Sequence, residues 1–256
     1  MKDEKLKQIF EKAAQRNSWG DPDSLSGPGS NHYQTRIIRE AIPGLLSEYK
    51  IKKMLDAPCG DFFWMKEIIG KLTFILESYT GADLVADLVK NNEVKFGNEK
   101  VNFIQLNLIE QIVPQVDLIF TRDCFLHLSY QNIYKILLNY KKSGSAYLLL
   151  STYAYETRIN TNVPGFSLHG RALNMMKFPF NFPDPLRIIN EGCTEGNHAY
   201  ADKSLCLWEI KNIPLFKIKI NIGLISTITF LKEIPVSILN FSKRVFNKLK
   251  RIAVRK

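Results

Sequence analysis

The sequence predicts an α/β fold, a doubly wound and mainly parallel sheet of seven strands with helices on both faces. From residue 51 onward, short apolar runs alternate with segments of helical periodicity. That alternation is typical of parallel strands joined by crossover helices. The run 146–152 (AYLLLST) is almost continuously apolar, as expected for a strand that helices cover on both faces.

The expected elements follow this alternation along the chain. Strands are expected at 53–56, 78–83, 101–106, 116–121, 146–152, 186–190 and 204–210. Helices are expected at 2–16, 35–50, 63–70, 84–92 and 129–140. The stretch 153–185, after the fifth strand, is rich in Asn, Pro and aromatic residues and has no periodicity. Because long irregular segments inside compact domains are usually functional, we expect a substrate-binding insert there.

Length and composition indicate a globular core with two appendages. The chain has 256 residues, of which 45% are hydrophobic and 23% charged, which excludes disorder and coiled coil. We expect N-terminal helices and a lid loop at 1–50, a core at 51–210 and a tail at 211–256. The lid is expected at 18–31, which is rich in Gly, Pro, Ser and Asp.

The net charge of +10 lies entirely in the tail. Residues 211–256 hold eleven of the 35 Lys and Arg residues and one of the 25 acidic residues, so 1–210 hold 24 of each. A neutral core argues against a nucleic-acid partner. Apolar residues recur at helical spacing between basic ones at 238–252, which predicts peripheral contact of 232–256 with an anionic membrane. Packing of that helix on the core or on a second subunit is the alternative.

The beginning of the sequence and the cysteines bear on the compartment. The first fifteen residues, MKDEKLKQIFEKAAQ, are charged throughout and lack the apolar region of a signal peptide. The four cysteines form no CxxC pair, so we expect reduced thiols and no metal site. These features predict a cytoplasmic protein, with its tail at the inner membrane surface.

The stretch that indicates a ligand is the end of the first strand and the turn after it. The strand KMLD ends at Asp56, and Ala57-Pro58-Cys59-Gly60 follows as a turn of small residues. Asp83 ends the second strand, 27 residues on. A carboxylate there can accept both hydroxyls of a ribose, so the spacing fits a ligand of the mononucleotide type. An NAD site is disfavoured because the turn has one glycine where G-x-G-x-x-G is needed.

These residues resemble the class I S-adenosylmethionine-dependent methyltransferases. The family's first motif, D-x-G-x-G-x-G, reads D-A-P-C-G-D-F here, with Pro58 and Phe62 in place of the first and last glycines. The segment 116–129 (VDLIFTRDCFLHLS) is similar to the fourth motif. The resemblance implies a Rossmann-like fold with S-adenosylmethionine (SAM) as the cofactor. The cofactor-binding residues that it implies are Asp56, Ala57, Pro58, Cys59, Gly60, Asp83, Leu84, Asn107 at the adenine, and Arg122.

A narrower resemblance bears on the acceptor. The forms SWGDPDSLSGPGS, LDAPCGDFFWM and RDCFLHLS look like a bacterial subgroup associated with surface-polysaccharide gene clusters. This implies O-methylation of a sugar hydroxyl, on a glycan or on a nucleotide-linked sugar. Methylation of another small acceptor, such as a phosphate-containing metabolite, is one alternative. A non-catalytic cofactor-binding scaffold, tethered at membranes by the tail, is the other.

The candidates for proton transfer follow the fourth strand. Asp123 and His127 are spaced i, i+4, so on a helix they share a face at the mouth of the sheet. Either side chain can take a proton from an acceptor hydroxyl. Asp123 as the cap of a helix at 124–140, and His127 as a half-buried structural histidine, are the alternatives. Arg122 can pair with the methionine carboxylate of the cofactor or with a substrate phosphate, and a surface salt bridge is the alternative.

The remaining candidates come from the insert and the lid loop. His169 is a third catalytic candidate. Tyr153, Arg171 and Asn174 are expected on the substrate side, and Arg158 or Arg171 is expected to hold the diphosphate of a nucleotide-sugar. Trp19 is expected to close the site as part of the lid, on the substrate side.

Overall fold

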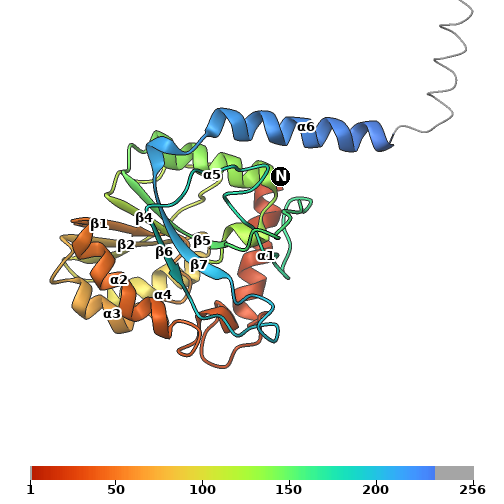
Figure 1. Ribbon diagram of the computed structural model, residues 1–256. Helices are drawn as coiled ribbons and strands as arrows, with labels where there is room; N and C mark the ends of the chain where they lie inside the picture. The colour runs from red at the N-terminus through yellow and green to blue at the C-terminus, as the bar shows by residue number, and fades with distance from the viewer. Residues whose placement is uncertain (1, 234–256) are drawn as a thin grey trace, which may run out of the picture.

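The computed structural model describes residues 2–233 of the chain, with side chains from 8 to 229 (Figure 1). The helices are α1 Lys2–Gln15, α2 Arg36–Glu48, α3 Met65–Leu72, α4 Ala86–Phe96, α5 Tyr130–Lys142 and α6 Leu215–Glu233. The strands are β1 Lys53–Asp56, β2 Ser78–Asp83, β3 Val101–Gln105, β4 Leu118–Thr121, β5 Tyr147–Tyr153, β6 Arg187–Asn190 and β7 Lys203–Glu209. Short 3-10 helices lie at Pro28–Ser30, Phe125–His127 and Ile210–Asn212.

The seven strands form one sheet in the order β3-β2-β1-β4-β5-β7-β6. The first five strands run parallel to one another, and β7 is antiparallel to both β5 and β6. The predicted α/β class, with a seven-stranded and mainly parallel sheet, is confirmed. The chain runs outward from β1 through β2 to β3 and then returns to β4 on the other side of β1. This reversal opens a crevice at the carboxyl ends of β1 and β4.

Both faces of the sheet are buried, as the apolar strands predict. In β5, Leu148 and Leu150 face a core that α5 and the start of α6 cover, whereas Leu149 faces a core that α2 and α3 cover. All three side chains are fully buried. Successive side chains of a strand point to opposite faces, so a continuous apolar run is the pattern that such a strand needs.

The helix expected at 129–140 is confirmed as α5, and a short element that was not predicted separates it from β4. A 3-10 helix at Phe125–His127 comes first, and α5 begins at Tyr130. Ser129 caps α5, because its Oγ accepts a hydrogen bond of 3.2 Å from the amide of Asn132. Its extended backbone, at φ −62° and ψ 155°, is typical of a residue that starts a helix.

The described part of the tail is a helix that packs against the core. Ile218 and Ile222 of α6 are buried in the same core as α5, and Asn221 donates to Pro179 O (2.8 Å) and Asn181 Oδ1 (3.0 Å) of the insert. In Figure 1, α6 lies across α5 and its second half extends past it. The amphipathic helix predicted at 238–252 lies outside the described residues. Within 2–233 no helix is long and apolar enough to span a membrane.

Candidate functional site

A cavity of about 310 Å³ lies where the carboxyl ends of β1, β2, β3 and β4 meet. The lid loop and residues 168–171 of the insert complete its walls. The predicted site residues that line it are Trp19, Asp56, Pro58, Cys59, Gly60, Asp83, Leu84, Asn107, Arg122, Asp123, His127, Tyr153, His169 and Arg171. Residues from the two motifs, the insert and the lid therefore meet in one cavity.

Three predicted site residues have structural contacts instead. Ala57 is fully buried, and its amide donates to the carbonyl of Phe120 at 2.9 Å. Arg158 forms an ion pair with Asp202 and donates to a neighbouring carbonyl. Asn174 is fully buried and bonds to backbone groups of the insert. The structure places none of the three on the cavity wall.

The turn after β1 is built around Gly60. Its φ of +57° is a left-handed conformation that glycine adopts without strain. A Cβ at this position would collide with Ser26 Oγ of the lid loop. Phe62, which replaces the last glycine of the motif, also has a positive φ of 58°, and its buried ring packs against Tyr79 and Phe103. The backbone at Gly60 therefore lies close to the lid loop. Phe62, at the position of the motif's last glycine, contributes its ring to the core instead.

Asp83 connects the end of β2 to this turn. One carboxylate oxygen accepts from the Gly60 amide at 3.0 Å, and the other accepts from the Val85 amide at 2.9 Å. Burial raises the pKa of Asp83, although these amides oppose the shift. A carboxylate oxygen can accept more than one hydrogen bond, so Asp83 keeps acceptor capacity toward the cavity that it lines.

Asp56, at the end of β1, is a buried acid beside a phenol. The Tyr79 hydroxyl donates to its Oδ2 at 2.5 Å. Burial raises the pKa of Asp56 to about 7, and the hydrogen bond from Tyr79 only partly opposes this shift. Asp56 therefore lies near the midpoint of its titration at neutral pH, where a nearby cation would favour its charged form.

Asn107 follows β3 at the predicted adenine end of the cavity. Its Oδ1 accepts from the Ile109 amide at 3.0 Å, and its Nδ2 donates to Glu110 Oε2 at 3.0 Å. These bonds orient the amide within a turn, and Leu84 also lines the cavity. The cavity wall here combines apolar surface with a fixed polar group, which is the usual make-up of a small-ligand site.

Asp123 and His127 do not share a face of one α-helix, which corrects the expectation from their spacing. Asp123 has a left-handed backbone at φ 52° and precedes the 3-10 helix that contains His127. Nor does it cap the following helix, since Ser129 does so. Its amide donates to Ser151 Oγ at 2.9 Å. Both side chains nevertheless line the cavity.

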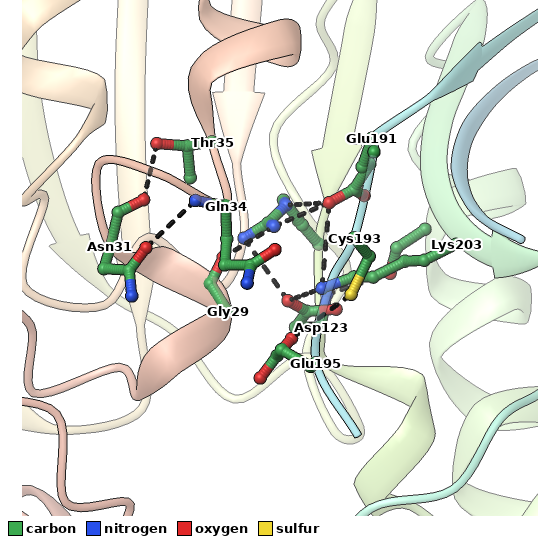
Figure 2. A network of polar contacts seen from close by, with 12 residues as sticks. Gly29, Asn31, Gln34, Thr35, Asp123, Glu191, Cys193, Glu195 and Lys203 are labelled. Carbon is green, nitrogen blue, oxygen red and sulfur yellow. Dashed lines mark hydrogen bonds and ion pairs between the residues drawn. The ribbon is translucent and has the colours of Figure 1, made fainter. Parts of the chain in front are cut away.

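A cluster of four charged side chains lies beside the cavity, three of them buried and Asp123 partly exposed (Figure 2). Arg122 donates to Glu191 Oε2 through Nη2 (2.6 Å) and Nε (3.1 Å). Lys203 Nζ lies between the carboxylates, 2.6 Å from Asp123 Oδ2 and 3.7 Å from Glu191 Oε2. Arg122 Nη1 is 3.3 Å from Asp123 Oδ2. Two cations thus face two anions.

This cluster determines the protonation of Asp123. Burial opposes ionisation, but the Lys203 ammonium and the Arg122 guanidinium lower the pKa of Asp123 to about 2. Conversely, Asp123 and Glu191 raise the pKa of Lys203 despite its burial and the nearby Arg122. Asp123 is therefore an ionised carboxylate at every physiological pH and a weak proton acceptor.

His127 lies on the cavity wall close to Trp19. Its Nδ1 is 2.8 Å from the carbonyl of Ser167 in the insert, and its ring centroid is 6.1 Å from that of Trp19. A carbonyl only accepts hydrogen bonds, so Nδ1 carries the ring proton and Nε2 keeps its lone pair. Burial lowers the pKa of His127, which keeps the ring neutral at pH 7.

Hydrogen bonds attach the lid loop to Asp61, to Arg122 and to the insert, where Trp19 Nε1 donates to the carbonyl of Leu168 at 3.4 Å. Asp61 accepts from Ser24 Oγ (3.0 Å), the Leu25 amide (2.7 Å) and Ser26 Oγ (3.2 Å). At its other end, Arg122 Nη2 donates to the carbonyl of Gly29 at 2.7 Å. Residues 25–30 line the cavity. The loop predicted as a lid therefore forms one wall of the site.

Sequence reasoning missed Asp61, Glu191 and Lys203. Glu191 lies 69 residues from Arg122, and Lys203 lies 80 residues from Asp123. The only local signal was a lysine at the start of the otherwise apolar strand KSLCLWE. Within 2–233 no group of His, Cys, Asp and Glu side chains is arranged to hold a metal ion.

Comparison with known proteins concerns the fold. No family model and no curated protein matches the chain. Magnesium protoporphyrin IX methyltransferase (ChlM) from Synechocystis PCC 6803, solved with bound SAM, is similar over 82% of this chain and 97% of its own, at 12% identity and a TM-score of 0.53. Human N-acetylserotonin methyltransferase (ASMT), in complex with SAM, is similar over 66% of this chain and 54% of its own, at 13% identity and a TM-score of 0.46. The chain has the fold of a SAM-dependent methyltransferase, as the first of these structures shows.

Proposed function

We propose that this protein is a cytoplasmic SAM-dependent O-methyltransferase that acts on a sugar hydroxyl. The observation that carries the proposal is the pairing of Asp83 with Gly60 on the wall of a cavity at the switch point of this fold. A buried acid at the end of β2 suits the two hydroxyls of a ribose. The solved neighbour ChlM carries bound SAM on the same fold.

The cavity walls fit the separate parts of SAM. Asp83 would hold the ribose, Asn107 and Leu84 the adenine, and Asp56 the ammonium of the methionine moiety. Gly60 leaves room where a side chain would intrude. Arg122 is committed to Glu191, Asp123 and Gly29, so we assign it to positioning these groups. When bound, SAM supplies an electrophilic methyl group.

His127 is the residue that we assign to proton transfer. Its Nε2 keeps a lone pair because Nδ1 carries the ring proton, and its ring is neutral because burial lowers its pKa. An acceptor hydroxyl within hydrogen-bond reach would give its proton to this nitrogen. His169 also lines the cavity and remains a second candidate.

Asp123 takes a different role in this proposal. Its pKa of about 2 makes it a poor base. Its Oδ1 is buried without a hydrogen-bond partner among the described residues. Since an unpaired buried acceptor is unfavourable, we assign it to accept a hydrogen bond from a hydroxyl or ammonium of a bound ligand.

The acceptor end of the cavity suits hydroxyl groups better than phosphates. Arg171 donates Nε, Nη1 and Nη2 to the carbonyls of Thr161, Leu126 and Leu128, and Arg158 does not line the cavity. Both guanidinium groups proposed for a diphosphate therefore have other partners. Trp19, Tyr200 and Glu195 also line the cavity, and such groups bind the faces and hydroxyls of sugars.

Methyl transfer to defined acceptors tests the proposed function. The full chain is incubated with methyl-labelled SAM and with sugars, nucleotide-linked sugars or phosphate-containing metabolites that lack a sugar. We expect labelled O-methyl ether in the sugar sets. Transfer only to the metabolites supports the alternative acceptor class. SAM binding without transfer to any set supports a non-catalytic scaffold.

A further inference from the structure

Helix α6 carries two separate apolar faces. Ile218 and Ile222 are buried in the core, and Asn221 anchors the same side of the helix to the insert. A second set of side chains is exposed: Phe216 (78%), Ile220 (47%), Leu224 (53%) and Ile228 (53%). We call these four residues the outer face. Packing on α5 therefore accounts for only one side of the helix.

The spacing makes the outer face one continuous strip. Its members are four residues apart, so each lies about 40° around the helix from the last and one turn further along. Single exposed apolar side chains are ordinary, but a contiguous strip is a feature of an interaction site. Figure 1 shows the second half of α6 extending past α5, so the strip runs out beyond the core.

The charge around the outer face indicates what covers it. Lys217 and Lys219 are exposed on the same helix, and 210–232 contains no acidic residue. The whole of 211–256 carries eleven basic residues and one acidic residue. A second copy of this chain would bring an equally positive segment against the first. An anionic lipid surface has negatively charged headgroups that attract the basic residues, and acyl chains below them that can bury the apolar side chains.

We infer that the outer face of α6 docks on an anionic lipid surface, with the helix lying in the interface. The four apolar side chains enter the boundary between headgroups and acyl chains, and the lysines contact lipid phosphates. The helix lies on the bilayer instead of crossing it, because no described helix is long and apolar enough to span a membrane. This inference does not depend on the proposed methyl transfer.

Vesicle co-sedimentation of the full chain tests the inference. The probes are vesicles of phosphatidylcholine alone and vesicles of phosphatidylcholine mixed with phosphatidylglycerol. We expect binding to the anionic vesicles that weakens as salt is raised. The double variant Leu224→Gln/Ile228→Gln is expected to bind them at least about tenfold more weakly, which corresponds to about 1.4 kcal/mol.

The matched control is Val94→Gln/Ile112→Gln, which changes two other exposed apolar residues (81% and 56%) and is expected to bind like the unaltered chain. Unchanged thermal midpoints show that both variants fold. No binding to anionic vesicles, or equal binding by both double variants, overturns the inference. So does a lipid-free dimer that the α6 variant abolishes, since the outer face would then bind a second copy.

Discussion

Replacing His127 with glutamine is expected to lower kcat for methyl transfer by about 10²–10⁴-fold, which is the usual contribution of a general base. The structure gives the reason: the Ser167 carbonyl fixes the proton on Nδ1, so Nε2 is free to accept one. Glutamine has a similar length but no basic nitrogen. The affinity for SAM should stay within about twofold, because the proposed function assigns SAM binding to Asp56, Asp83 and Asn107 and not to His127.

The pH profile separates a base from a merely structural histidine. The pKa of His127 is lowered by burial from its ordinary value of 6.5. The base must be neutral, so kcat/KM of the unaltered enzyme should rise with pH along a limb centred below 6.5. That limb should be absent in His127→Gln. The exposed His198→Gln serves as the control and should retain both rate and limb. A kcat within about threefold of the unaltered value in His127→Gln would reject His127 as the base.

Replacing Glu191 with glutamine is expected to destabilise the fold by about 3–5 kcal/mol, the usual effect of breaking a buried ion pair. Glu191 is fully buried, and its carboxylate bonds Arg122 twice and lies 3.7 Å from Lys203. Without its charge, two buried cations share the single carboxylate of Asp123. For a chain of this size the thermal midpoint should fall by roughly 10 °C. Chemical denaturation measures the free energy directly.

An exposed ion pair provides the control for Glu191. Glu48 lies 3.8 Å from Arg187, with side chains 50% and 56% exposed, so Glu48→Gln should change stability by less than about 1 kcal/mol. Equal midpoints for the two variants would contradict the role given to the cluster. A large loss of stability in Glu191→Gln alone would show that the burial of Arg122 and Lys203 depends on the Glu191 charge.

The sheet could be predicted because its signals are local. The run AYLLLST and the alternation of strands with helices each depend on neighbouring residues. The insertion of β7 between β5 and β6 was not predicted, because strand order depends on pairing between distant segments. The helix expected after β4 was confirmed as α5, but the 3-10 helix at Phe125–His127 was not predicted. The left-handed backbone of Asp123 and the cap at Ser129 bound this short element.

For the site as well, residues with local sequence signals could be predicted, whereas residues brought together by distant pairing could not. Asp56, Gly60 and Asp83 could be found because a strand end and a small-residue turn mark them in sequence. Glu191 and Lys203 could not, because only the pairing of β7 with its neighbours brings them beside Arg122 and Asp123. Arg158 and Asn174 have the right chemistry for a substrate, but their partners are protein groups that sequence does not reveal.

Calorimetric titration of the full chain and of Asp83→Ala with SAM, S-adenosylhomocysteine and NAD measures whether Asp83 holds the ribose of SAM. We expect one-to-one binding of the two adenosyl compounds to the full chain and no binding of NAD. Asp83→Ala should weaken binding by at least about tenfold, since a buried carboxylate that accepts hydroxyl donors is lost. Binding of NAD without SAM, or SAM binding that is unaffected in Asp83→Ala, would contradict these expectations.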